Sequence, residues 1–144
     1  MTQFKDMRIV EADVLVLGGG LAGHRAAVAA RGAGASVALA YHARGASQAS
    51  IGFNVPLGDV DPRDGADAYY DDMLRGGYAL NERRLVRALA DGAKPALAQL
   101  DALGVPFARN GDKFAQRHLS GNTYARSVYH PNGIGRLALD RLTG

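Results

Sequence analysis

The sequence predicts an α/β fold that opens with a strand–helix–strand unit, and three observations carry this prediction. Residues 13–17, DVLVL, form a continuous apolar run, as expected of a parallel strand buried on both faces. Three glycines at 18–20 follow and lead into an alanine-rich segment, 21–32, which is typical of a helix. A second apolar run at 36–41, SVALAY, completes the unit within about thirty residues, the usual length of a βαβ unit.

The glycines at this corner follow the pattern GxGxxG, which predicts a Rossmann-like dinucleotide-binding site. Gly18 permits the tight turn, Gly20 lets the backbone approach a pyrophosphate, and Gly23 lets the helix pack closely on the strand. The start of the helix offers free N–H groups and a partial positive charge to phosphates. Because the motif follows a strand and opens a helix, we favour dinucleotide binding over a purely structural turn.

The charges around the corner are unusual. No carboxylate occurs from Val14 to Gly58, which suits an anionic ligand, although a buried strand and helix also exclude charge. A Rossmann site normally has Asp or Glu at the end of the second strand, where it accepts hydrogen bonds from a ribose. Tyr41 stands at that place, followed by His42, and a hydroxyl lacks the bidentate grip of a carboxylate. The nearby Arg44 leaves open an NADP-type interpretation, in which it meets a 2′-phosphate.

The remaining segments are expected to be scaffold. The aspartates from Asp59 to Asp72 lack the glycine and spacing of a calcium loop, so we interpret them as a loop and a solvated helix start and predict no metal site. Apolar periodicity and the turn signals predict these elements: a helix from Glu82 capped by Asn81 and broken at Gly92, a second helix from Lys94-Pro95 to Gly104, a hairpin of 105–107 and 113–117 around Asn110-Gly111, and a final helix over 133–142.

Composition excludes several classes of protein. The chain of 144 residues has no cysteine, so neither a disulfide framework nor a thiolate metal site is possible. The formal net charge is only +3 and basic residues are spread along the chain, so nucleic acid is not an expected partner. The first twelve residues lack the apolar core of a signal peptide, and no run reaches membrane-spanning length. We therefore expect a cytoplasmic location, or at most the inner face of a membrane.

Longer stretches carry a resemblance to a known family. ARGASQASIGFNVPLGDVDP follows the second strand, LRGGY at 74–78 leads to Asn81, and LGVPF at 103–107 follows a predicted helix. Together with the glycine corner, this series resembles the N-terminal part of the FAD-binding flavoproteins that include succinate dehydrogenase and fumarate reductase flavoprotein subunits, aspartate oxidase and adenylylsulfate reductase. The likeness runs from Asp13 to Leu142.

The resemblance implies FAD as the cofactor. Membrane-bound members attach flavin to a histidine just after the serine that Ser47 resembles; Gln48 stands there, so the implied attachment is non-covalent. Ile134-Gly135 replaces an expected Thr-Gly pair and, with Tyr41 and Gln48, indicates a divergent member. The implied cofactor contacts are Gly18, Gly20, Leu21 and Ala22 at the pyrophosphate, with Gly23 behind them, Tyr41 and His42 at the adenosine, and Ala46, Ser47, Gln48, Ser50 and Gly52 at the flavin.

The resemblance also implies that the chain is catalytically incomplete by itself. Only two long parallel-type strands are predicted, whereas the chains of that family are several times longer. We expect residues 1–144 to be the N-terminal part of an FAD-binding domain, truncated before the rest of the parallel sheet and without the substrate-capping domain. Hydride transfer to or from a small dicarboxylate-type acid would then belong to a full-length parent, and the isolated chain would self-associate or need a partner subunit.

No catalytic residue is predicted. Arg117, His118, Arg126 and His130 are the only candidates for a carboxylate clamp, and we interpret both histidines as structural, since neither has a partner at a motif spacing. Two alternatives stay open. One is a non-catalytic dinucleotide-binding module completed by a partner chain; the other is an NADP-dependent reductase that uses Arg44.

Overall fold

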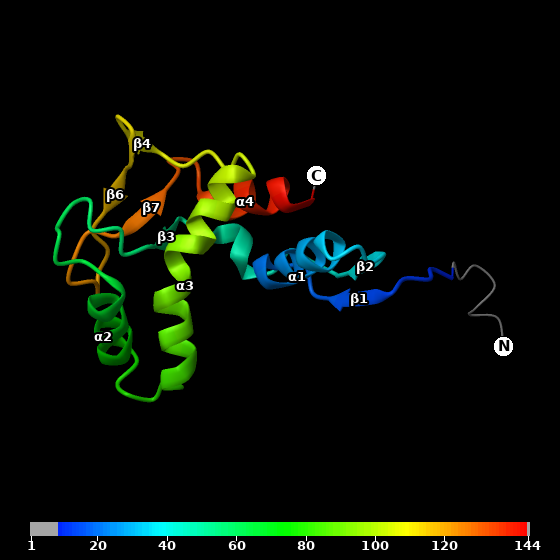
Figure 1. Ribbon diagram of the computed structural model, residues 1–144, viewed down its shortest axis with the longest axis horizontal. Helices are drawn as coiled ribbons and strands as arrows, with labels where there is room; N and C mark the ends of the chain where they lie inside the picture. The colour runs from blue at the N-terminus through cyan, green and yellow to red at the C-terminus, as the bar shows by residue number, and fades with distance from the viewer. Residues whose placement is uncertain (1–8, 144) are drawn as a thin grey trace.

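A computed structural model describes residues 9–143 of the chain. Figure 1 shows the strand–helix–strand unit at one end of the molecule, and two helices with the antiparallel strands at the other. A single 3₁₀ turn, η1 (Ala46–Ala49), and the last helix, α4 (Ile134–Thr143), lie between these parts, where α4 contacts both η1 and the first helix. The final helix predicted over 133–142 is therefore confirmed.

The predicted βαβ unit is confirmed. Strands β1 (Val14–Leu17) and β2 (Val37–Ala40) pair in parallel, in register from their first residues to their last. Helix α1 (Leu21–Gly32) connects them. It lies so close to β1 that a Cβ on Gly23 would stand 1.9 Å from the carbonyl oxygen of Gly18, so only glycine fits there.

The antiparallel strands form two small sheets. In the larger, β3 (Gly52–Asn54) and β6 (Gln116–Arg117) flank β7 (Ser127–Tyr129). The smaller is the hairpin of β4 (Arg109–Asn110) and β5 (Lys113–Phe114), turned at the predicted place.

The predicted hairpin arms are wrong in extent. Residues 105–107 form no strand, because Val105 donates its N–H to the end of the preceding helix and Phe107 donates to the carbonyl of Val105. The second arm, 113–117, is divided at Ala115 between two sheets, since the N–H of Ala115 bonds to the carbonyl of Ala108 rather than continuing either ladder.

The helices in the middle of the chain differ from the prediction in two respects: one helix replaces the two that were predicted, and its cap is another residue. Helix α2 (Ala66–Gly76) precedes α3 (Arg83–Ala102), which is one continuous helix through Gly92 and Pro95. An exposed glycine costs a helix only about 1 kcal/mol. The buried stripe of α3, defined below, continues past Gly92 and Pro95. Glu82, not Asn81, caps α3, because its carboxylate accepts from the N–H of Arg84 at 3.0 Å. The stripe comprises Val86, Ala90, Ala93 and Leu97.

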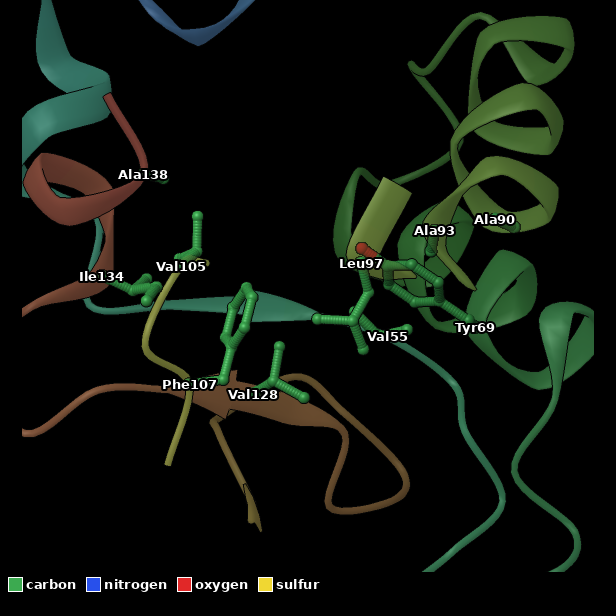
Figure 2. Packing of buried hydrophobic residues seen from close by; sticks show 10 residues of the cluster. All are labelled: Val55, Tyr69, Ala90, Ala93, Leu97, Val105, Phe107, Val128, Ile134 and Ala138. Atoms are coloured by element: carbon green, nitrogen blue, oxygen red, sulfur yellow. The ribbon is translucent and has the colours of Figure 1, made fainter. Parts of the chain in front are cut away.

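The core lies between α3, α4 and the larger sheet. Figure 2 shows Phe107 and Val128 packed between Val55 and Ile134, with the α3 residues closing one side. The parallel pair is covered much less: Leu15 and Leu17 of β1 are 63% and 77% exposed. Within residues 9–143, β1 is thus half-buried on one face and exposed on the other, rather than buried on both. No helix in this part of the chain is long and apolar enough to cross a membrane.

Candidate functional site

The glycine corner connects β1 to α1 in the conformation that the motif requires. The N–H of Gly18 donates to the carbonyl of Ala40 at 2.9 Å, which fixes the corner to the end of β2. Gly18 has a φ of +121°, a conformation that side-chain-bearing residues rarely adopt. Gly20 is the N-cap of α1 in an extended conformation and brings no capping side chain of its own. The start of the helix is therefore bare backbone.

Several N–H groups of this helix start have no partner. In the part of the chain that the structure describes, no acceptor is found for the N–H groups of Gly20, Ala22 and Gly23. The N–H of Leu21 instead donates to the hydroxyl of Ser47 at 3.3 Å. Unpaired N–H groups and the positive end of the helix dipole together form an anion-binding site. The corner thus has three donors for a phosphate group.

Tyr41 lies directly over the corner. A Cβ on Gly19 would stand 2.5 Å from the Tyr41 ring and 2.9 Å from the carbonyl oxygen of Ala43, so the chain after β2 packs on the glycine backbone. Tyr41 is 45% exposed, and the centroid of its ring lies 5.9 Å from that of His24, with the two rings tilted to each other. Tyr41 therefore holds the place after β2 where a carboxylate would meet a ribose.

His24 was not anticipated as part of this corner. It is 1% exposed, and its Nδ1 lies 3.0 Å from the carbonyl oxygen of Gly20. Its Nε2 has no hydrogen-bond partner among the described residues. A histidine in an alanine-rich helix start was the only signal in the sequence, and a buried imidazole there stabilises the N-cap carbonyl.

The 3₁₀ turn η1 joins the starts of two helices. The hydroxyl of Ser47 accepts from the N–H of Leu21. A Cβ on Gly135 would stand 1.9 Å from the carbonyl oxygen of Ser47. The carbonyl of Ser50 accepts from the N–H groups of Ile134 and Gly135, at 3.1 and 2.9 Å. The glycine of the Ile134-Gly135 pair is thus required by close packing, and the 47–50 segment is fixed beside the corner.

The other predicted flavin-side residues have different surroundings. Ala46 and Gln48 are exposed on η1, and His42 is exposed after β2. Gly52 is half-buried, and a Cβ there would stand 2.3 Å from the hydroxyl oxygen of Ser127. Packing between β3 and β7 therefore already requires glycine at 52. The structure brings Gly18 to Gly23, Tyr41 and Ser47 together at the corner, with Gly52 farther along the chain at the edge of the larger sheet.

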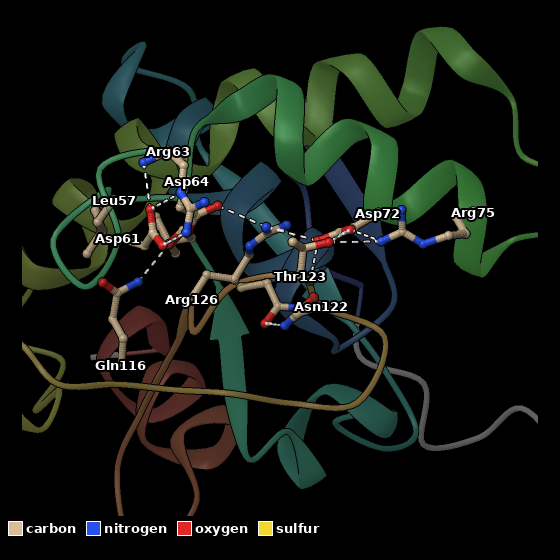
Figure 3. Close-up of polar contacts among 12 residues, drawn as sticks. Leu57, Asp61, Arg63, Asp64, Asp72, Arg75, Gln116, Asn122, Thr123 and Arg126 are labelled. Atoms are coloured by element: carbon tan, nitrogen blue, oxygen red, sulfur yellow. Dashed lines mark hydrogen bonds and ion pairs between the residues drawn. The ribbon is translucent and has the colours of Figure 1, made fainter.

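A buried cluster of charges lies away from the corner, and it corrects the sequence interpretation of the aspartates. Figure 3 shows Arg126 between Asp64 and Asp72, and its Nη2 is 2.9 Å from one oxygen of each. The Arg126 side chain is 0% exposed, and those of Asp64 and Asp72 are 2% and 3% exposed. The sequence predicts only a loop and a solvated helix start over Asp59 to Asp72, and the burial of both carboxylates differs from it. Their partner is distant in sequence, so no local pattern could reveal the cluster.

The two carboxylates of this cluster differ in their pKa. Burial raises the pKa of Asp64, and the charge of Arg126 offsets this only in part. Burial also acts to raise the pKa of Asp72, but hydrogen bonds from the hydroxyl and N–H of Thr123, with the charges of Arg126 and Arg75, outweigh it and lower that pKa. These contacts hold the fold together, because the cluster joins α2 to the segment before β7.

The remaining clamp candidates are engaged or scattered. Arg117 donates to the carbonyl of Ile51 at 2.7 Å and lies over the ring of Tyr129. Nδ1 of His130 accepts from the N–H of Asn132, and His118 is exposed. No group of three or more potential metal ligands occurs within residues 9–143.

An apolar groove of about 220 Å³ lies between α1 and α3 beside β3. Leu21, Phe53 and Leu97 are among its lining residues. Its one charged lining residue, Arg25, is hydrogen-bonded to Gln99. With so little polar chemistry, the groove offers no candidate catalytic group.

Comparison with known proteins gives a consistent result. The family model described as FAD binding domain matches residues 13–141. A fumarate reductase (CoM/CoB) chain of Methanothermobacter marburgensis is 35% identical over 136 residues, which cover 90% of this chain and 25% of that protein. L-aspartate oxidase of Halobacterium salinarum is 36% identical over 134 residues, covering 92% and 24%.

Solved structures agree with these relatives. Mycobacterium smegmatis Sdh1 in complex with UQ1 matches with a TM-score of 0.85 at 29% identity, over 91% of this chain and 23% of that one. A mutant of the E. coli quinol fumarate reductase FrdA matches with a TM-score of 0.84 at 27% identity, over 95% and 24%. The chain thus spans about a quarter of the length of the proteins it matches.

Proposed function

Because the chain belongs to the FAD-binding domain family, we propose that it is the FAD-binding part of an oxidoreductase related to fumarate reductase and succinate dehydrogenase flavoproteins. The observation that carries the proposal is the bare start of α1, where the N–H groups of Gly20, Ala22 and Gly23 have no acceptor among residues 9–143. These donors and the helix dipole suit the pyrophosphate of FAD.

The residues around the corner fit the other parts of the cofactor. Tyr41 and the exposed His42 would contact the adenosine. Leu21 would lie against the pyrophosphate without donating its N–H, because that N–H already donates to the hydroxyl of Ser47. Gly18 would make the turn that exposes the donors. The flavin side would run along Ala46, Ser47, Gln48, Ser50 and Gly52.

The attachment of FAD is proposed to be non-covalent. Gln48 is exposed on η1, at the position where the resemblance expects a linking histidine. A carboxamide has no nucleophilic lone pair of the imidazole kind, so it would contact the flavin by hydrogen bonds only.

When bound, FAD would supply hydride exchange with a small dicarboxylate-type acid in the full-length protein. Of the four candidates for a clamp on such a substrate, the two arginines, Arg117 and Arg126, are both held by other protein groups. We therefore propose that substrate binding and proton delivery depend on residues beyond these 144. The names of the relatives, two of them fumarate reductases, support this substrate class.

Titration with FAD, followed by quenching of flavin fluorescence, tests the proposal. The protein should bind FAD saturably, and Gly20→Val should abolish binding, because its side chain would crowd Ser47 and the space needed by the pyrophosphate. Gly32→Ala is the matched control, since a Cβ at Gly32 meets nothing within 4 Å. Undiminished FAD affinity in Gly20→Val would contradict the proposed site.

A second candidate is a non-catalytic dinucleotide-binding module that a partner chain completes. The exposure of Leu15 and Leu17 on the parallel pair favours it, because a bare apolar strand face normally has a covering partner. In either case the FAD site is the same. The two candidates differ in whether the chain takes part in catalysis.

A further inference from the structure

The corner lacks the carboxylate that normally selects the ribose. In dinucleotide sites, an acidic residue at the end of the second strand accepts from the 2′-hydroxyl, whereas a nearby arginine accommodates a 2′-phosphate. Here Tyr41 follows β2, and the next charged group along the chain is Arg44. By these two residues alone, the corner would select a 2′-phosphorylated nucleotide.

Arg44 lies against the corner. A Cβ on Gly20 would stand 3.9 Å from the carbonyl oxygen of Arg44, and a Cβ on the next residue, Gly45, would stand 3.9 Å from the Cα of Gly20. Tyr41, three residues earlier, covers Gly19. Arg44, with its guanidinium, therefore belongs to the segment that packs on the corner, three residues after Tyr41, the predicted ribose position.

That guanidinium is already paired. Its Nη1 donates to Oδ1 of Asp140, a residue of α4 that lies 96 residues away in the sequence. The Arg44 side chain is 29% exposed and that of Asp140 is 49% exposed. The hydrogen bond and the charge of Asp140 raise the pKa of Arg44, with a smaller contribution from the neighbouring Tyr41, and together they outweigh burial, which acts to lower it. Since no carboxylate occurs from Val14 to Gly58, this counter-charge comes from a distant helix.

We propose that Asp140 is a specificity-determining residue which makes the ribose site select an unphosphorylated adenosine. It does so by occupying Arg44, so that a 2′-phosphate finds no free cation and meets an additional negative charge. The inference rests on the proposed FAD site at the glycine corner. It accounts for FAD binding by a corner whose local sequence also suits NADP.

The experiment compares ADP-ribose with 2′-phospho-ADP-ribose, which differ only in the 2′-phosphate. Binding of each is measured by isothermal titration calorimetry at fixed, low salt, because exposed ion pairs are screened. The wild-type protein should prefer ADP-ribose. In Asp140→Asn the affinity for 2′-phospho-ADP-ribose should rise by about tenfold or more, the value of a new charge-assisted hydrogen bond, while that for ADP-ribose stays unchanged.

Two further variants make the result specific. Asp101→Asn is the matched control: Asp101 is 38% exposed and pairs with Arg109, so it tests the effect of net charge alone. The double variant Arg44→Ala with Asp140→Asn should lose the gained affinity. The inference would be overturned if Asp140→Asn and the wild type had the same ratio of affinities for the two ligands. An equal gain in affinity for 2′-phospho-ADP-ribose in Asp101→Asn would overturn it as well. Neither result would contradict the FAD site. If the wild-type protein binds neither FAD nor ADP-ribose, the proposed function itself is overturned.

Discussion

Replacing Arg126 by methionine removes the cation shared by two buried carboxylates, and we expect it to destabilise the protein strongly. Asp72 keeps its hydrogen bonds from Thr123, at 2.7 and 2.6 Å, and its ion pair with Arg75. Asp64 keeps no ion-pair partner among the described residues. Most of the cost should therefore fall on Asp64, whose side chain is 2% exposed.

Breaking a buried ion pair by removing one partner costs about 3–5 kcal/mol. A loss of about 4 kcal/mol lowers the ratio of folded to unfolded protein about a thousandfold, out of a typical total stability of about 5–15 kcal/mol. Urea unfolding followed by circular dichroism measures the free energy of unfolding. Arg63→Met is the control: Arg63 is 74% exposed and pairs with Asp61, so its loss should cost at most about 1 kcal/mol.

The pH dependence has a definite sign. The pKa of Asp72 is lowered, so its ionisation stabilises the fold above its unfolded pKa, and this is lost as pH falls through the folded pKa. The pKa of Asp64 is raised, so its contribution is the reverse: full below the unfolded pKa and lost as pH rises. Without Arg126, protonation of Asp64 and Asp72 stabilises the folded state, because it removes two negative charges that have lost their shared cation. The deficit of Arg126→Met should thus shrink from pH 7 to pH 4.

Adding Asp64→Leu to Arg126→Met should recover part of the lost stability, because it removes the carboxylate left without a partner. Equal costs for Arg126→Met and Arg63→Met, with no change in the deficit on acidification, would refute the argument that the cluster is a buried ion network. If Arg126→Met fails to fold at pH 7, the double variant still provides the comparison.

The remaining predictions concern the cofactor and the chain's activity. Acid denaturation of the FAD-loaded protein should release all flavin into the supernatant, since Gln48 offers no covalent link; flavin retained on the precipitated polypeptide would contradict this. The chain alone should not reduce fumarate with a reduced flavin donor, because Arg117 and Arg126 are held by other groups. Light scattering should show self-association, because Leu15 and Leu17 leave an apolar face of β1 exposed. Clear turnover by a monodisperse monomer would contradict both expectations.

The βαβ unit could be predicted from the sequence because all its signals are local. An apolar run, a glycine motif and a small-residue helix occur in order, and β1 and β2 pair as they predict. The predicted interruption of α3 is wrong because the signals for it are local, whereas the burial that keeps the helix continuous is tertiary. Gly92 and Pro95 are local costs, whereas the burial of one stripe of α3 is a tertiary gain that exceeds them.

The polar contacts of the site could not be predicted, because they join distant parts of the chain. Thr123 and Asp72 are 51 residues apart, and Arg44 and Asp140 are 96 apart. No spacing rule connects such residues. The contact of Ser47 with Leu21 is likewise tertiary: the hydroxyl of Ser47 accepts from the first turn of α1, 26 residues earlier in the sequence.

The central claim is that the start of α1 holds the pyrophosphate of FAD, and backbone amide NMR of the 144-residue chain tests it most directly. On addition of FAD, the amide resonances of Gly20, Ala22 and Gly23 should shift most, since these N–H groups have no acceptor among the described residues. The amide of Gly111, in the hairpin turn, should stay in place. Shifts that spare the three α1 amides and fall elsewhere on the molecule would contradict the account.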